Sequence, residues 1–136
     1  AAMATAGRIA PDALPPGIRA AAYLPGQDAA RRSQLVICNG GSATVYQALA
    51  EGVPVLGIAS NMDQHLTMQA VKRAGAGILL RAGQTDRGAV RQAVLELLAS
   101  PGYRQAAGQV AAEFARYDAA SRFSAFVDMH FGQSGK

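Results

Sequence analysis

Residues 35–51 read Leu35-Val-Ile-Cys-Asn-Gly-Gly-Ser-Ala-Thr-Val-Tyr-Gln-Ala-Leu-Ala-Glu51. An apolar run over residues 35–38 ends abruptly in Asn39-Gly40-Gly41-Ser42, and a helical pattern begins near Ala43. Such a strand-to-helix turn is a common phosphate-binding arrangement, because glycines let backbone N–H groups approach an anion and the positive end of the helix dipole faces it. The segment therefore predicts a strand, a phosphate-binding loop and a helix.

The same alternation of apolar runs and helical patterns continues on both sides of this segment. We expect strands at residues 1–5, 19–24, 35–38, 54–58 and 77–80, and helices at residues 27–33, 43–51, 62–74, 85–99, 101–116 and 119–131. Asn61 is the expected N-cap of the helix at 62–74, and Gly75 its stop. Strands separated by helices predict an α/β fold with a doubly wound, Rossmann-like, mostly parallel sheet. We expect one domain over residues 1–131 and a C-terminal tail at 132–136.

The composition of the chain argues against several classes of protein. The chain has 136 residues, the length of one domain, and none of its apolar runs approaches the ~20 residues that a membrane span needs. Its single cysteine, Cys38, excludes an internal disulfide and favours a cytoplasmic location. The net charge is +4, but the arginines are scattered, which argues against nucleic-acid binding. No cluster of His, Asp or Glu has metal-ligand spacing, so no metal is expected.

Three loops are expected at the carboxyl ends of the strands, where doubly wound sheets bind ligands near the reversal in strand order. They follow Leu24, Cys38 and Ile58. The ring of Tyr23 could stack on a base, and the glycine turn could hold a diphosphate. Asp63-Gln64 could bind hydroxyl groups, because the pair offers both acceptors and donors. Together the loops predict a nucleotide-sugar site.

Five short segments carry a family resemblance. They are Tyr23-Leu24-Pro25, Asn39-Gly40-Gly41-Ser42-Ala43-Thr44-Val45-Tyr46-Gln47-Ala48, Gly52-Val53-Pro54, Asp63-Gln64 and Gly75-Ala76-Gly77. In order and spacing they resemble the C-terminal, donor-binding half of the GT-B glycosyltransferases of the UDP-glycosyltransferase-like family. A weaker similarity extends from Ala2 to about Phe131.

The resemblance implies a role for each residue of the expected site. Tyr23 would stack on the base, Gln47 would face the ribose, and Asp63 with Gln64 would bind the sugar hydroxyls. The diphosphate would be bound, chiefly through backbone N–H groups, by Gly40, Gly41, Ser42, Ala43 and Thr44. From the residues alone, a half-buried strand-end ring at Tyr23 and a first-turn acid at Asp63 remain alternatives.

Two positions depart from the family pattern. The histidine of the phosphate loop is Asn39 here, and the ribose-binding glutamate is Gln47. Asn39 can donate a hydrogen bond to a phosphate oxygen but carries no charge, so backbone dipoles must supply most of the stabilisation of the leaving diphosphate. The donor is expected to be a UDP-sugar or a dTDP-sugar, used as a substrate, and no cofactor is expected.

Other reactive or aromatic side chains are interpreted as structural. Cys38 is expected to be an inert strand-end thiol, His65 a surface or packing histidine, and His130 a structural residue of the last helix. Four rings are expected to pack among the terminal helices: Tyr117, Phe123, Phe126 and Phe131.

The resemblance also implies parts that the chain lacks. Family enzymes have an N-terminal acceptor-binding domain that supplies the general base, so no catalytic residue is expected in these 136 residues. The first, central strand of the C-terminal domain is also expected to be missing, between the strands at 1–5 and 35–38. We therefore expect an inactive fragment that could self-associate through its unpaired strands.

The resulting hypothesis is the donor-binding part of a hexosyltransferase. A base from the absent domain would deprotonate an acceptor hydroxyl, which attacks the anomeric carbon while the nucleoside diphosphate leaves. Two alternatives remain open: a non-catalytic donor-binding subunit of a split glycosyltransferase, and a fragment of a sugar-nucleotide epimerase.

Overall fold

A computed structural model describes residues 2–4 and 14–131. Its elements, in chain order, are β1 (Ala2–Ala4), β2 (Arg19–Ala21), α1 (Gly26–Arg31), β3 (Val36–Cys38), α2 (Ser42–Ala50), β4 (Val55–Ala59), α3 (Met62–Arg73), β5 (Gly77–Arg81), a 3-10 helix (Ala82–Gln84), α4 (Arg87–Ala99), α5 (Pro101–Ala115) and α6 (Ala119–Phe131). Every expected strand and helix is present, with ends shifted by a few residues. The 3-10 helix was not expected, and the expected tail at 132–136 lies outside the described residues.

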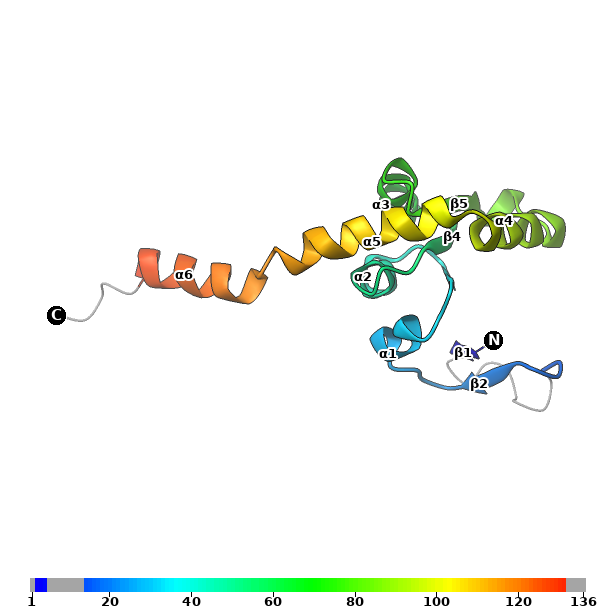
Figure 1. Cartoon of the computed structure of the whole chain (residues 1–136), viewed down its shortest axis with the longest axis horizontal. Helices are drawn as coiled ribbons and strands as arrows, with labels where there is room; N and C mark the ends of the chain where they lie inside the picture. Colours follow the sequence, from blue (N-terminus) through cyan, green and yellow to red (C-terminus); the bar gives the residue numbers. More distant parts are fainter. Residues whose placement is uncertain (1, 5–13, 132–136) are drawn as a thin grey trace.

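All the described strand pairs are parallel, and they form two sheets. One sheet pairs β1 with β2, and the other has the order β3-β4-β5, with Val36 opposite Val55 and Val55 opposite Gly77. In the part of the chain that the structure describes, no ladder joins the two sheets (Figure 1). The expectation that a central strand is missing between the strands at 1–5 and 35–38 stays a prediction.

Helices cover both faces of the three-stranded sheet, as the doubly wound class requires. Successive side chains of a strand point to opposite faces, and β4 follows this rule: Val55 joins a core with α2, α3 and α5, while Leu56 joins a core with Ala93 and Leu97 of α4. Leu79 of β5 packs toward the first core and its neighbours Ile78 and Leu80 toward the second. The expected α/β layering is confirmed.

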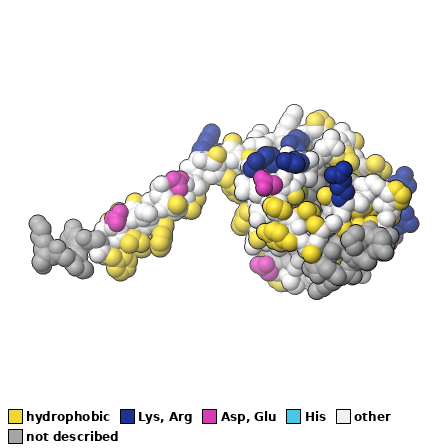
Figure 2. Space-filling view, turned by 90° about the horizontal axis from the view of Figure 1, so that it is seen from below, with side chains coloured by type: hydrophobic (Ala, Val, Ile, Leu, Met, Phe, Trp, Pro, Cys, Tyr) yellow, Lys and Arg dark blue, Asp and Glu magenta, His cyan; other side chains and the backbone are white. Residues whose placement is uncertain are grey.

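The last helix does not pack as the sequence analysis expected. α6 continues away from the body of the molecule (Figure 1), and none of its residues is buried. Tyr117, Phe123, Phe126 and Phe131 are exposed by 60%, 68%, 51% and 68%. The predicted packing of these rings is wrong because α6 reaches beyond the other described elements, and Figure 2 shows hydrophobic side chains along this projecting helix.

Among the described residues, no helix is both long enough and apolar enough to cross a membrane.

Candidate functional site

The carboxyl ends of β3, β4 and β5 lie in a row at one edge of the three-stranded sheet, because all three strands run parallel. Three connections begin there: residues 39–41 after β3, residues 60–61 after β4, and the 3-10 helix after β5. The candidate residues of the central segment of the sequence therefore lie on neighbouring loops.

The loop after β3 depends on Gly40. Its φ is +82°, a left-handed value that other residues adopt only with strain. A Cβ at this position would lie 2.6 Å from Cγ of Met68 and 3.2 Å from the carbonyl oxygen of Gln64. Both the backbone and the packing therefore require glycine, and the contact brings the loop after β3 against the first turn of α3.

Two local side chains shape this turn by accepting hydrogen bonds from its N–H groups. The Gly40 N–H donates to Sγ of Cys38 (3.3 Å), and the Gly41 N–H donates to Oδ1 of Asn39 (3.0 Å). Burial raises the pKa of the Cys38 thiol, and the Gly40 N–H partly offsets this effect. A raised pKa keeps the thiol protonated at neutral pH, which agrees with the interpretation of Cys38 as unreactive.

The first turn of α2 offers unsatisfied donors to solvent. Gly41 is the N-cap, its carbonyl accepts from the Val45 N–H, and it provides no side-chain cap. The N–H groups of Ser42, Ala43 and Thr44 have no partner inside the helix, because an α-helix leaves its first N–H groups unpaired. All three residues are exposed. Three free N–H groups at the positive end of a helix form a typical anion-binding arrangement.

The loop after β4 is held by Gln64. The Ser60 N–H and the Ser60 hydroxyl both donate to Oε1 of Gln64, at 2.9 and 3.0 Å. The Gln64 N–H donates to Oδ1 of Asn61 at 3.0 Å, which confirms Asn61 as the N-cap of α3. Since Oε1 already accepts two bonds, the amide NH₂ of Gln64 is the part left for a ligand. Asp63 is exposed in the same helical turn.

Gln47 and Tyr23 lie on the other side of the α2 N-terminus. The side chain of Gln47 extends to the start of α1, where a Cβ at Gly26 would collide with its Oε1. Gly26 directly follows Tyr23-Leu24-Pro25, so the Gln47 side chain lies next to the end of this segment. The ring of Tyr23 is 80% exposed, so it is not the half-buried ring that the sequence left as an alternative.

Several residues of this region were not predicted from the sequence. Met68 is fully buried beneath Gly40, four positions after Gln64 on α3. A hollow of about 420 Å³ also lies between the carboxyl ends of β4 and β5, and His65 and Arg81 are among its lining residues. The i, i+4 spacing of Gln64 and Met68 could have indicated that they share a helix face. The hollow depends on the unexpected 3-10 helix.

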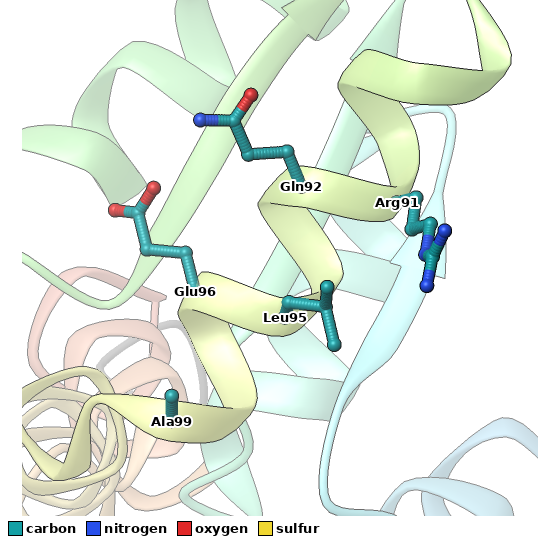
Figure 3. Close-up of a pocket in the computed structure, with 5 residues that line it drawn as sticks. All are labelled: Arg91, Gln92, Leu95, Glu96 and Ala99. Atoms are coloured by element: carbon teal, nitrogen blue, oxygen red, sulfur yellow. The ribbon is translucent and has the colours of Figure 1, made fainter.

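A larger hollow, of about 600 Å³, lies along α4. Figure 3 shows that its lining side chains all project from this one helix: Arg91, Gln92, Leu95, Glu96 and Ala99. It is a helix surface away from the carboxyl ends of the strands, and it contains none of the candidate residues. Among the described residues, no group of three or more His, Cys, Asp and Glu side chains could hold a metal ion.

A known protein family matches most of this chain. A family model described as erythromycin biosynthesis protein CIII-like, C-terminal domain, matches residues 2–121. A PGL/p-HBAD biosynthesis rhamnosyltransferase of Mycobacterium bovis is 51% identical over 113 residues, 83% of this chain and 25% of that protein. A PGL/p-HBAD biosynthesis glycosyltransferase of Mycobacterium tuberculosis is 52% identical over 111 residues, 82% of this chain and 26% of that protein. The chain thus spans about a quarter of the length of these relatives.

Several solved glycosyltransferases have the same fold as this chain. The calicheamicin glycosyltransferase aligns with 99% of this chain and 35% of its own, with a TM-score of 0.83 and 23% identity, a likeness that shows the fold. The spinosyn rhamnosyltransferase aligns with 76% of this chain and 28% of its own, with a TM-score of 0.70 and 30% identity. That enzyme has also been solved in complex with thymidine diphosphate.

Proposed function

Because the chain belongs to the family of the erythromycin biosynthesis protein CIII-like C-terminal domain, we propose that it is the donor-binding part of a glycosyltransferase that transfers a sugar from a nucleotide sugar to an acceptor hydroxyl. One observation of the structure carries the proposal: the loop that leads into the exposed first turn of α2, residues 42–44, packs through Gly40 against Gln64. A diphosphate and its attached sugar need neighbouring sites of these two kinds.

In this proposal the chain stabilises the leaving group. An acceptor hydroxyl attacks the anomeric carbon of the sugar, and the bond to the diphosphate oxygen breaks with its electron pair going to that oxygen. The negative charge that develops there faces the N–H groups of Ser42, Ala43 and Thr44 and the positive end of α2. Acceptor binding and the general base are assigned to the part of the relatives that has no counterpart in this chain.

We assign the remaining donor contacts to side chains around this helix end. Tyr23 contacts the base, Gln47 the ribose, and Asp63 with the amide NH₂ of Gln64 the sugar hydroxyls. Among the two donors expected from the sequence, a dTDP-sugar is favoured over a UDP-sugar. Its support is the thymidine diphosphate complex of the spinosyn rhamnosyltransferase and the rhamnosyltransferase among the relatives.

Replacing Ser42 with proline tests the diphosphate site. Proline suits the first position of a helix, and the residue before it must be extended, as Gly41 already is at φ −65° and ψ 140°. Ser42→Pro should therefore preserve the fold while it removes one N–H donor. A hydrogen bond to a charged group contributes about 1.5–3 kcal/mol, so the affinity for thymidine diphosphate should fall about tenfold or more.

The matched control is Ser42→Ala, which removes the hydroxyl but keeps the N–H. Calorimetric titration of both variants with thymidine diphosphate should show the large loss in the proline variant alone. Equal affinities in the wild type and a folded Ser42→Pro variant would contradict the assignment of the diphosphate to this helix end.

A further inference from the structure

The hollow between the carboxyl ends of β4 and β5 has an unusual set of lining side chains. It is lined by Ala59, Ser60, Asn61, Met62, His65, Arg81, Ala82, Gly83 and Gln84. The set includes one arginine and one histidine but no acidic residue. The hollow shares Ser60 and Asn61 with the turn that holds Gln64, so it adjoins the proposed sugar contacts.

A chain of hydrogen bonds along α3 fixes the orientation of His65. Nη2 of Arg73 donates to Oε1 of Gln69 at 3.2 Å, and Nε2 of Gln69 lies 3.0 Å from Nε2 of His65. Arginine can only donate, so the amide oxygen of Gln69 must face Arg73 and its NH₂ group must face the histidine. Nε2 of His65 is then an acceptor, and the neutral ring carries its proton on Nδ1. The histidine is thereby prepared as a hydrogen-bond donor.

Arg81 supplies the positive charge of the hollow. It is the last residue of β5 and is exposed. Across residues 2–4 and 14–131, no carboxylate lies within ion-pair distance of its guanidinium, whereas Arg31 and Arg116 each have an acidic partner. Asn61 adds an amide NH₂, because its Oδ1 already accepts from Gln64. The polar lining therefore contains one unpaired cation and several neutral donors.

We propose that this hollow is a second subsite, beside the proposed sugar contacts, and binds a carboxylate group of the ligand. One guanidinium beside neutral donors matches a monoanion, and the planar fork of arginine fits the two oxygens of a carboxylate. The inference rests on the proposed function. Since the hollow lies beside Gln64, two molecules are sources of the carboxylate: the acceptor and the transferred sugar.

The test measures protection of Arg81 from phenylglyoxal, with the modification rate at each arginine followed by peptide mass spectrometry. Benzoate, added in the presence of thymidine diphosphate, should slow the modification of Arg81 at least about threefold, because a bound carboxylate covers the guanidinium. Arg91 on α4 is the reference in the same sample, and its rate should not change. Benzamide, a neutral molecule of the same shape, should give no protection.

A variant separates a built subsite from simple ion pairing at the surface. His65→Leu removes the second donor but leaves Arg81 in place, so the protection by benzoate should weaken. Equal protection by benzoate and benzamide, equal protection of Arg91, or unchanged protection in His65→Leu would each overturn the proposal. Calorimetry with thymidine diphosphate alone reports separately on the donor site, so a failure of the proposed function is distinguishable.

Two nucleotide sugars then identify the source of the carboxylate. If the sugar carries it, UDP-glucuronic acid should protect Arg81 more strongly than UDP-glucose does. If the acceptor carries it, the two nucleotide sugars should protect equally little, while benzoate still protects. Equal and strong protection by both would overturn the proposal, since the hollow would then bind a part of the donor that carries no carboxylate.

Discussion

At the residue scale, Asp63 and Gln64 differ in which of their hydrogen-bonding groups remain available to a ligand. Gln64 uses its side-chain oxygen to fix Ser60, and its main-chain N–H is bonded to Asn61. Asp63 is exposed, with both carboxylate oxygens at the first turn of α3. The pair therefore combines a residue that builds the turn with a residue whose charge is available to a ligand.

Asp63→Ala should accordingly affect the sugar and not the nucleotide. In a complete enzyme, the affinity for the intact nucleotide sugar should fall about tenfold or more, because a hydroxyl loses a charged acceptor. The affinity for the bare nucleoside diphosphate should stay nearly unchanged. Calorimetry with the two ligands checks this, and equal losses for both would place Asp63 outside the sugar contacts.

Glu51 provides a residue with a pH-dependent role. It accepts hydrogen bonds from Nε2 of Gln27 (2.8 Å) and Nε of Arg31 (3.3 Å), which tie α1 to the end of α2. The bond from Gln27, and then that from Arg31, lower the pKa of the Glu51 carboxyl below its ordinary value of 4.5. Folding thus favours the ionised form, and this contribution to stability is complete above the unfolded pKa and lost as pH falls through the folded pKa.

Urea unfolding of the wild type and Glu51→Gln over a range of pH checks the direction of this pH dependence. The wild type should be the more stable protein at pH 7, and the difference should disappear as the pH falls below about 4.5. A difference that stays constant down to acidic pH would show that the charge of Glu51 contributes nothing.

At the scale of elements, Met68 joins β4, α3 and the glycine loop. Its side chain is fully buried, lies beneath Gly40, and also fills the space beside Gly57 of β4. A Cβ at Gly57 would lie 2.5 Å from Sδ and 2.8 Å from Cε of Met68. A small residue on the strand and a large one on the helix are therefore complementary in size.

Substitutions that enlarge Gly57 and shorten Met68 should show that the two residues are complementary in size. Gly57→Ala should overpack the core at a cost of about 1–3 kcal/mol, and Met68→Ala should leave a cavity at a cost of about 2–5 kcal/mol. The double variant should be more stable than the sum of the single effects predicts, by about 1 kcal/mol or more, because each change relieves the other.

Urea unfolding of all four proteins gives this coupling energy. Gly57→Ala combined with Val71→Ala is the matched control, since Val71 is buried on the same helix and in the same core, whereas the three atoms nearest to a Cβ at Gly57 all belong to Met68. Additive effects in both pairs would contradict the complementarity.

The order of strands and helices could be predicted from the sequence because each element carries its own apolar period and its own stop signal. Gly52 and Gly75, read as helix ends, have φ values of +65° and +69°. Contacts between distant segments could not be predicted in this way. The contact of Met68 with Gly40 and that of Gln47 with Gly26 produce no periodic pattern in the sequence. The aromatic residues of α6 do produce an apolar pattern, but the pattern does not indicate which surface the helix packs against. The ligand roles assigned to the ten candidate residues stay predictions.

At the scale of the whole molecule, the described strands end in open edges. β3 pairs only with β4, and β1 only with β2, so one side of each strand has unpaired N–H and C=O groups in the part of the chain that the structure describes. Such edges favour pairing with another chain. In the described residues, the two sheets are therefore not joined by a continuous hydrogen-bonded framework.

The 136-residue chain should self-associate in solution, which light scattering over a range of concentrations will detect. Ile37→Lys should reduce the association, because a lysine on an edge strand opposes strand pairing, and the 51% exposure of Ile37 allows the change. Leu98→Lys on α4, a helix position with the same 51% exposure, serves as the control. A monomeric wild type would show that the open edges are protected.

The free N–H groups at the start of α2 also bear on how such a protein can diverge. A contact made by the main chain is the same for almost any side chain, so mutation can replace Ser42, Ala43 or Thr44 with little effect on an anion held there. Residues that set the path of the main chain have no such freedom, and Gly40 is the clearest case. A lineage that acquires a new donor should therefore change at Gln47 or Asp63 while the turn is inherited unaltered.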